Sequence, residues 1–303
     1  MLSLAAAHSI AQNYPVKPVR IIVPFAPGGG TDVTARVLGK QLSGAMGQTF
    51  IVENRPGAEG AIGTDLVAKS TPDGYTLLVL TPGFVIGAAL QKDLPYNSRK
   101  DFSPVAFIGE QPLVLVIGMK VPATNAQELL QLARSKPGEL AFATTDPSTN
   151  MAMEMLRQSM KVDFRIVPYK GGGQAVTDIL GGHISGVITS LSSVQQQMSA
   201  NAIRAVAITT STRSPSTPDL PTLSESIAPG YEFPSWFILL APSATPRPVL
   251  VQLNREVLGA VQVPETRDFF AKMALRAVPL QLDGAQERLT REFDKWEKFA
   301  AAR

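Results

Sequence analysis

A glycine-rich turn near the N-terminus carries the residue types best suited to holding an anion. Residues 20–35 read RIIVPFAPGGGTDVTA, an apolar run followed by proline, three glycines and a Thr-Asp pair. Glycine lets the backbone turn sharply and approach a ligand without a Cβ in the way. A helix that begins just after the turn would present free N–H groups and the positive end of its dipole. The stretch therefore predicts a cradle for a negatively charged group.

A second turn of the same kind lies in the other half of the chain. Residues 165–180 read RIVPYKGGGQAVTDIL, again with an apolar run, a Val-Pro-aromatic step, three glycines and a Thr-Asp pair. One such turn is a weak signal, but two in one chain indicate two similarly built α/β lobes. Ligands of open α/β sheets bind outside the carboxyl ends of the strands, where these loops lie. If the lobes face one another, both glycine turns can line one cleft.

Residues for covalent, metal or nucleotide chemistry are scarce. The chain has no cysteine and only two histidines, His8 and His183, which excludes thiolate and multi-histidine metal sites. The first glycine turn carries Val33 where a dinucleotide fingerprint needs its third glycine, and no P-loop ending occurs. Ser185, in GHISG, has the wrong spacing for a hydrolase nucleophile. These observations favour binding without catalysis, with no metal and no cofactor.

Composition and charge indicate a folded protein that does not bind nucleic acid. The 303 residues are 45% apolar and 17% charged, and the net charge is +3 with scattered Lys and Arg. Residues 1–13 resemble a secretory signal that lacks its positive region, with LSLAAA as the apolar part and Ser9-Ile10-Ala11 as the cleavage site. No later stretch has the roughly 18 apolar residues of a membrane span. We therefore expect a secreted, unanchored protein.

Short apolar runs alternate with helix-length segments along most of the chain. The runs predict strands at 19–25, 50–54, 75–80, 103–109, 113–119 and 235–246. The longer segments predict helices at 31–46, 60–70, 125–135 and 148–160. This alternation predicts an α/β fold of mostly parallel sheets flanked by helices. Because the Ser- and Pro-rich stretch 211–234 looks like a return connection, we expect one lobe at 14–117 plus 237–303 and the other at 118–236.

Four blocks of the sequence, in order, are similar to the Bug-type solute receptors, the periplasmic binding proteins of tripartite tricarboxylate transporters. The blocks are PVRIIVPFAPGGGTDVTARVLGKQL, VENRPGAEGAIGTDLVAKSTPDGYTLL, VPYKGGGQAVTDILGGHI and WFILLAPSATPRPVLVQLN. The resemblance implies a two-lobed, monomeric periplasmic binding protein with its ligand cleft between the lobes. Such a receptor closes around a small organic carboxylate and delivers it to membrane permease components. An enzyme that acts on a small carboxylate in the same cleft remains the alternative.

The resemblance also implies which residues hold the ligand, because family ligands are held chiefly by two strand-to-helix loops, one from each lobe. The first loop maps onto Phe25, Ala26, Pro27, Gly28, Gly29, Thr31 and Asp32, and the second onto Thr144, Thr145, Asp146, Ser148, Thr149 and Asn150. Backbone N–H groups, hydroxyls and bridging waters would then meet a carboxylate. Since like charges repel, we expect Asp32 to cap nearby backbone N–H groups, with contact to a ligand amine as the alternative.

Three departures from the family pattern bear on the ligand. Asn150 stands where the second loop usually ends in histidine, Phe84 lies where Thr-His-Ala is frequent, and Thr189 stands where an acidic residue is frequent. Each departure makes the distal pocket less charged. We therefore expect Phe25, Phe84 and Tyr169 to form an aromatic wall. On this basis aromatic or apolar carboxylates should bind better than aspartate, glutamate or citrate. The alternative is that Phe84 packs inside its lobe and the dicarboxylate preference usual in the family is kept.

Overall fold

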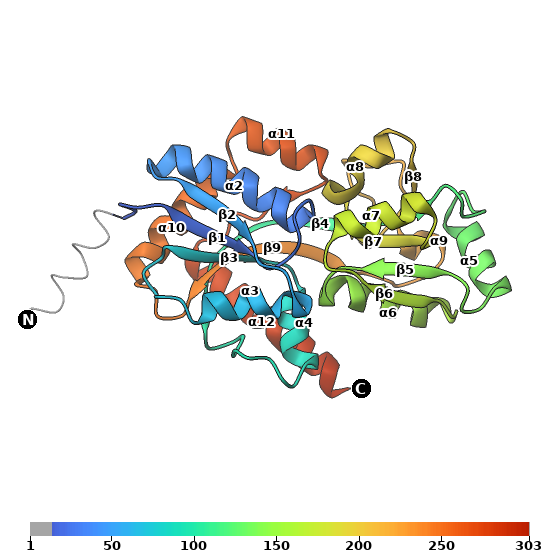
Figure 1. The fold of residues 1–303 in the computed structure, drawn as a ribbon, viewed down its shortest axis with the longest axis horizontal. Helices are drawn as coiled ribbons and strands as arrows, with labels where there is room; N and C mark the ends of the chain where they lie inside the picture. Colours follow the sequence, from blue (N-terminus) through green and yellow to red (C-terminus); the bar gives the residue numbers. More distant parts are fainter. Residues whose placement is uncertain (1–13, 303) are drawn as a thin grey trace, which may run out of the picture.

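Two long strands, β4 (Phe102–Gly118) and β9 (Pro234–Pro242), run through the centre of the molecule. The structure is a computed structural model that describes residues 14–302, so the predicted signal segment, residues 1–13, lies outside the described residues. The strand order is β2-β1-β3-β9-β4-β7-β5-β6, with β8 and β10 also paired to β4. Figure 1 shows the two ends of this order as two lobes that meet around the long strands.

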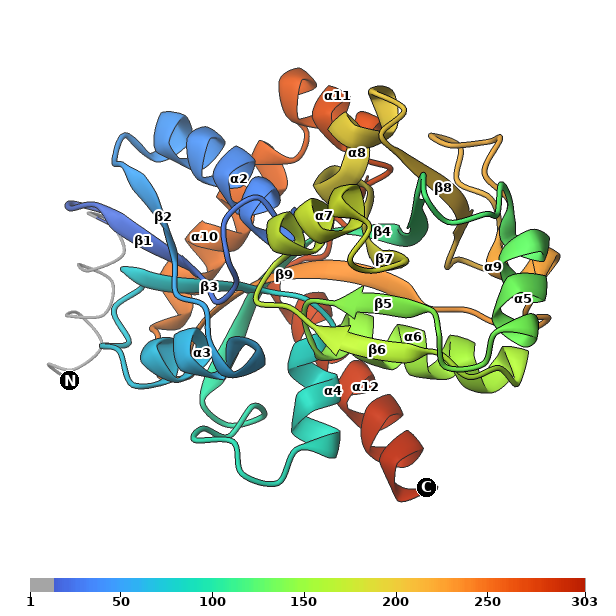
Figure 2. The same ribbon diagram turned by 45° about the vertical axis from the view of Figure 1, so that its right-hand side comes forward.

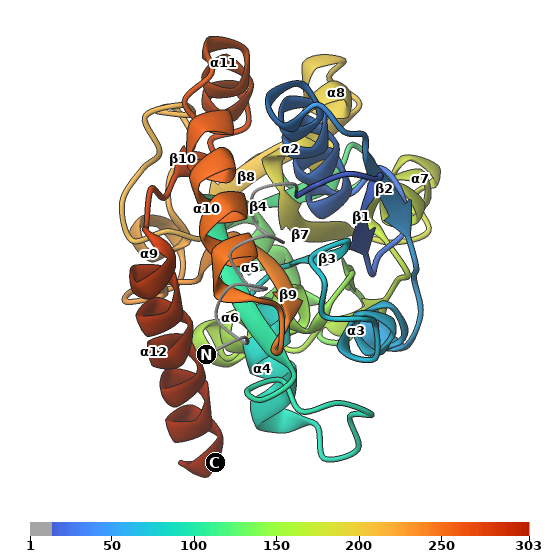
Figure 3. The ribbon, with the colours of Figure 1, turned by 90° about the vertical axis from the view of Figure 1, so that its left-hand side faces the viewer.

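The first lobe has a parallel core that antiparallel strands complete. In spatial order its parallel strands are β2 (Phe50–Asn54), β1 (Val19–Val23) and β3 (Thr76–Leu80). The sheet continues antiparallel through β9, β4 and the short β10 (Arg276–Ala277). One face is covered by α2 (Gly30–Met46), α10 (Arg247–Ala260) and α11 (Pro264–Lys272). The other face (Figure 3) carries η1 (Ala58–Gly60), α3 (Ala61–Ala68), α4 (Gly83–Leu90) and α12 (Leu282–Ala301).

The second lobe repeats this plan. Its parallel strands are, in spatial order, β6 (Arg165–Pro168), β5 (Ala141–Thr144) and β7 (Gly186–Ser190). The end of β4 runs antiparallel between β7 and β8 (Ile203–Ile208). One face carries α7 (Gly172–Gly181) and α8 (Leu191–Ser199). The other face carries α5 (Ala126–Ser135), α6 (Pro147–Met160) and α9 (Leu223–Ser226). Figure 2 shows α6 along the lower side of the sheet and α5 and α9 toward its right-hand end.

Strand β4 changes its partners between Pro112 and Leu113. Residues up to Pro112 pair with β9, whereas Leu113 and those after it pair with β7 and β8. The sequence predicts two strands here, 103–109 and 113–119, and that separation is wrong. Bulges near Pro104 and Gly109 bend the strand without interrupting its pairing with β9, so one strand of 17 residues serves both sheets. The two lobes are therefore joined by a pair of adjacent antiparallel strands.

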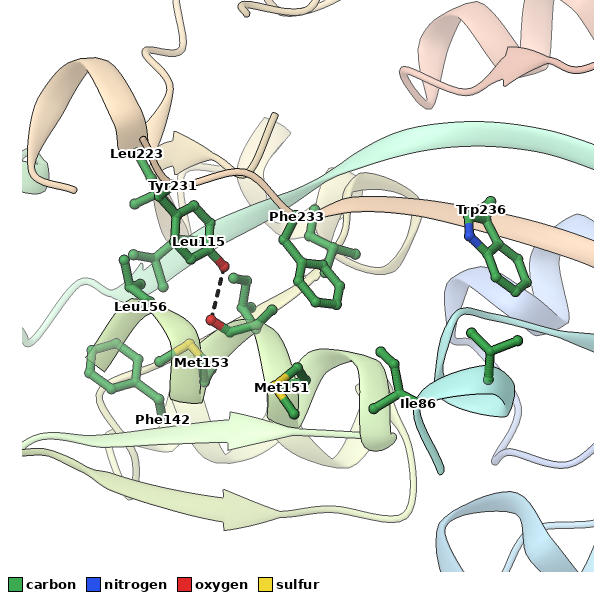
Figure 4. Close-up of a cluster of buried hydrophobic side chains, with 14 of the residues drawn as sticks. Ile86, Leu115, Phe142, Met151, Met153, Leu156, Leu223, Tyr231, Phe233 and Trp236 are labelled. Atoms are coloured by element: carbon green, nitrogen blue, oxygen red, sulfur yellow. Dashed lines mark hydrogen bonds between the residues drawn. The ribbon is translucent and has the colours of Figure 1, made fainter. Parts of the chain in front are cut away.

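A shared apolar core joins the lobes on one side of these strands. Ile86 of α4, in the first lobe, and Met151 of α6, in the second, belong to one cluster of buried side chains. Figure 4 shows both, together with Trp236 of β9 from the same cluster. The Tyr231 hydroxyl donates to the Ala152 carbonyl at 2.9 Å, which ties the chain just before β9 to α6. Burial of this apolar surface favours direct contact between α4 and α6.

Candidate functional site

A small cavity lies between the lobes, where strand ends and helix starts from both lobes meet. Its volume is about 50 Å³, which is enough to admit a small ligand. The starts of α2, α6, α7 and α8 form its walls, and β4 and β9 form its floor. The lining residues are Phe25, Ala26, Gly29, Gly30, Thr31, Asp32, Thr81, Gln111, Leu113, Thr145, Asp146, Ser148, Thr149, Gly171, Gly172, Thr189, Ser190, Ser193, Ser235 and Phe237.

The first glycine turn reaches the cavity through the start of α2. Gly29 is the N-cap and brings no side chain that could occupy the first amides of the helix. Asp32 accepts hydrogen bonds from the Gly28 amide at 3.0 Å and from Asn54 at 2.9 Å, and it pairs with Arg36. Burial opposes the ionisation of Asp32, but these bonds outweigh it and hold the pKa of Asp32 below its usual range. The expectation that Asp32 caps a nearby backbone N–H is confirmed.

The second loop is organised by Asp146, the N-cap of α6. Its carboxylate accepts from the Thr149 amide and from the Ser148 hydroxyl, both at 2.8 Å. The Thr149 hydroxyl accepts from the Asp146 amide at 3.1 Å, which completes a capping box, and Pro147 opens the helix. Asp146 therefore sets the shape of this loop through its immediate neighbours.

The lobes touch directly across the cavity. The Thr81 hydroxyl of the first lobe donates to the Asp146 carboxylate of the second at 2.6 Å. The Gly30 amide donates to the Ser193 hydroxyl at 2.9 Å. A Cβ placed on Gly30 would lie only 2.1 Å from Ser190 Oγ. The Ala26 amide also donates to the Lys170 carbonyl at 3.3 Å, so the two glycine-rich turns face each other in a closed arrangement.

The charges around the cavity come from acids alone. Asp32 and Asp146 line it, whereas no Lys, Arg or His stands among the described lining residues. A bound anion would therefore meet backbone N–H groups at helix starts, where the helix dipole is positive, together with Ser and Thr hydroxyls. Across residues 14–302, no group of three or more His, Cys, Asp or Glu is placed to hold a metal ion. In the same range no helix is long and apolar enough to cross a membrane.

The structure brings most of the residues predicted from the sequence to this cavity. Those that line it are Phe25, Ala26, Gly29, Thr31, Asp32, Thr145, Asp146, Ser148, Thr149 and Thr189. Those that do not line it are Pro27, Gly28, Phe84, Thr144, Asn150 and Tyr169. Thr144 is the last residue of β5, and the Gly28 amide donates to Asp32.

Two of the three predicted wall aromatics lie elsewhere, which corrects the expected aromatic wall. Phe84 is 5% exposed and packs edge-on against Phe102 and Phe293, because α4 turns it into the core of the first lobe. Tyr169 donates to Asp178 and faces a separate hollow beside Phe25. Partial burial, with help from Asp178, raises the pKa of Tyr169 to about 12. Asn150 lies outside the cavity too, in the groove between α4 and α6.

The floor of the cavity is the part that the sequence motifs do not reveal. It is formed by Gln111 and Leu113 of β4 and by Ser235 and Phe237 of β9. No motif marks these residues, and Gln111 and Ser235 become neighbours only through the register of the two strands. The available signal is a polar residue inside a long apolar strand, as in GEQPLVLVIG and PSWFILLAP. Thr81, at the end of β3, also escapes the sequence motifs.

Known proteins resemble this chain along nearly all of its length. A family model described as "Tripartite tricarboxylate transporter family receptor" matches residues 34–299. Protein BugT of Bordetella pertussis is 36% identical over 295 residues, which are 96% of this chain and 90% of that protein.

Solved structures extend the likeness to three dimensions. Rpa4515 of R. palustris, described "with adipate", is 31% identical with a TM-score of 0.91, and the match covers 95% of this chain and 97% of the Rpa4515 chain. MatC (Rpa3494) of Rhodopseudomonas palustris, described "with bound malate", is 29% identical with a TM-score of 0.89, and the match covers 95% of this chain and 100% of the MatC chain. The two-lobed α/β binding-protein fold expected from the sequence is confirmed.

Proposed function

Because this chain belongs to the tripartite tricarboxylate transporter receptor family, we propose that it is a periplasmic receptor that captures a small organic carboxylate between its lobes. The captured ligand is then delivered to the membrane permease components of such a transporter. The observation that carries this proposal is the cavity itself, where helix starts from both lobes converge and the described lining residues include no basic side chain. Backbone N–H groups can satisfy a carboxylate there without a fixed cation.

We propose short aliphatic carboxylates as the ligand class. A cavity of about 50 Å³ favours a small acid over a bulky one. The predicted aromatic preference depended on three rings, of which Phe25 alone lines the cavity. The relatives described with adipate and with malate, both aliphatic dicarboxylates, support the same class.

We propose that residues 14–117 with 237–303, and residues 118–236, move as the two lobes. The change of pairing in β4 at Leu113 favours a first boundary about five residues earlier. Rotation about β4 and β9 would open the cavity, and a bridging ligand would favour closure. The cavity lies between two lobes of the same chain, and we propose that the receptor acts as a monomer.

Thermal unfolding and titration calorimetry with a panel of straight-chain and aromatic carboxylates test this proposal. A ligand at a hundredfold excess over its Kd should stabilise the protein by about 2.7 kcal/mol, a rise of roughly 5–10 °C in Tm at about 2–4 °C per kcal/mol. Proton NMR of the mixture should show the ligand unchanged after prolonged incubation. Absence of any shift would overturn the receptor proposal, and turnover of the ligand would favour an enzyme.

A further inference from the structure

Gln111 lies at the floor of the cavity, at the point where β4 passes from one lobe to the other. It pairs with Ser235 of β9, and Leu113, two residues on, pairs with Ser190 of β7. Side chains two apart in a strand share a face, and Leu113, Ser190 and Ser235 all line the cavity. The side chain of Gln111 is therefore directed at the same cavity, and the residue is only 4% exposed.

The amide nitrogen of Gln111 is buried and has no hydrogen-bond partner. The Ser190 hydroxyl, at the same cavity, bonds those of Ser192 and Ser193. Leaving a buried donor unsatisfied is unfavourable because the donor loses its hydration without gaining a partner, so a buried donor of this kind points to a missing acceptor. Gln111 carries no charge that would add to or offset Asp32 and Asp146, and the Nε2 group of its side-chain amide is a hydrogen-bond donor.

We propose that Gln111 Nε2 donates a hydrogen bond to the distal oxygen-bearing group of the ligand. This inference rests on the proposed function and deepens it. One carboxylate occupies the helix starts at the walls, while the floor receives a second acceptor such as a carboxylate, carbonyl or hydroxyl oxygen. The receptor then prefers dicarboxylates and oxygenated acids to plain monocarboxylates of equal chain length. Gln111 is thereby a specificity-determining residue.

Calorimetry with matched acids measures this preference directly. The probes are succinate with butanoate and adipate with hexanoate, in which a methyl group replaces the second carboxylate. The wild-type protein should bind each diacid more tightly than its monoacid. Gln111→Met should reduce the ratio of diacid affinity to monoacid affinity about 10-fold or more, because a hydrogen bond to a charged group contributes an effect of this size. Monoacid binding should change little.

Two further variants keep the result interpretable. Gln252→Met removes an amide that donates to the Tyr14 carbonyl at 2.8 Å, away from the cavity, and should leave the affinity ratio unchanged. Gln111→Glu replaces the donor with a second acceptor and should reverse the preference toward monoacids, which covers the case in which the Met variant does not fold.

The outcomes separate the two proposals. An unchanged ratio in both Gln111 variants, or a wild-type protein that prefers monoacids, would overturn the role of Gln111 while the receptor function stands. A wild-type protein that binds none of the four probes nor any other carboxylate would overturn the receptor function and this inference with it.

Discussion

Replacing Gly30 with alanine tests whether the cavity closes by direct contact between the lobes. Gly30 is the first residue of α2, and a Cβ there would lie 2.1 Å from Ser190 Oγ and 2.8 Å from Ser190 Cβ. The hydroxyl can rotate away, but the Cβ is fixed by the end of β7. Overpacking of this kind costs about 1–3 kcal/mol, and here it arises only when the lobes are closed.

Because closure and binding are linked, the cost should appear in the affinity for the ligand. Gly30→Ala should weaken carboxylate binding about 5- to 150-fold, as measured by titration calorimetry. The fold should tolerate the change, since alanine is a better helix former than glycine and Gly30 does not adopt a positive φ. Small-angle scattering should show a larger radius of gyration for the unliganded variant than for the wild-type protein.

The same helix offers a matched control. A Cβ on Gly44 would have no atom within 4 Å, so Gly44→Ala should bind ligand like the wild-type protein. Adding Ser190→Gly to Gly30→Ala should restore part of the lost affinity. Wild-type affinity in Gly30→Ala, or an equal loss in Gly44→Ala, would refute the steric reasoning.

Three further substitutions separate packing, charge and interlobe contact. Phe84→Ala should lower the free energy of unfolding by about 3–5 kcal/mol in urea titrations, because Phe84 is a core residue; selective loss of ligand affinity at unchanged stability would contradict this. Arg20 lowers the pKa of Glu53 to about 2, so Glu53→Gln should cost about 1 kcal/mol at pH 7 after solvent screening. That difference should shrink as the pH falls from 4.5 to 2, and a difference independent of pH would count against it. Thr81→Val removes the bond to Asp146 across the cavity and should weaken binding about tenfold by calorimetry; unchanged affinity would show that the bond does not support closure.

The fold is largely predictable from local patterns. Strands β1 and β3 read as continuous apolar runs because helices bury both of their faces, and the glycines after β1 and β6 mark the turns into α2 and α7. The predicted kinship to the Bug-type receptors is confirmed by the family match and by BugT. What local patterns do not give is the pairing of strands distant in sequence. For that reason β4 is predicted as two strands rather than as one that serves both lobes.

The residues of the candidate site also fall into a group that local sequence patterns reveal and a group that they do not. Residues of the strand-to-helix loops, such as Thr31 and Ser148, are recognisable because the loop motif itself places them at the cavity. Gln111 and Ser235 lie far apart in sequence and meet only through the register between β4 and β9. The prediction for Phe84 is wrong for a related reason, since the environment of Phe84 depends on the packing of α4 against α12, which no local pattern reveals.

A crystal structure with the tightest-binding straight-chain carboxylate tests the central claim most directly. The ligand should occupy the cavity between the lobes, with the oxygens of one carboxylate about 3 Å from backbone N–H groups at the starts of α2 and α6. The contacts of Thr81 with Asp146 and of Gly30 with Ser193 should persist around it. A ligand bound in the groove between α4 and α6, or a carboxylate held instead by a Lys or Arg side chain, would contradict this description of the site.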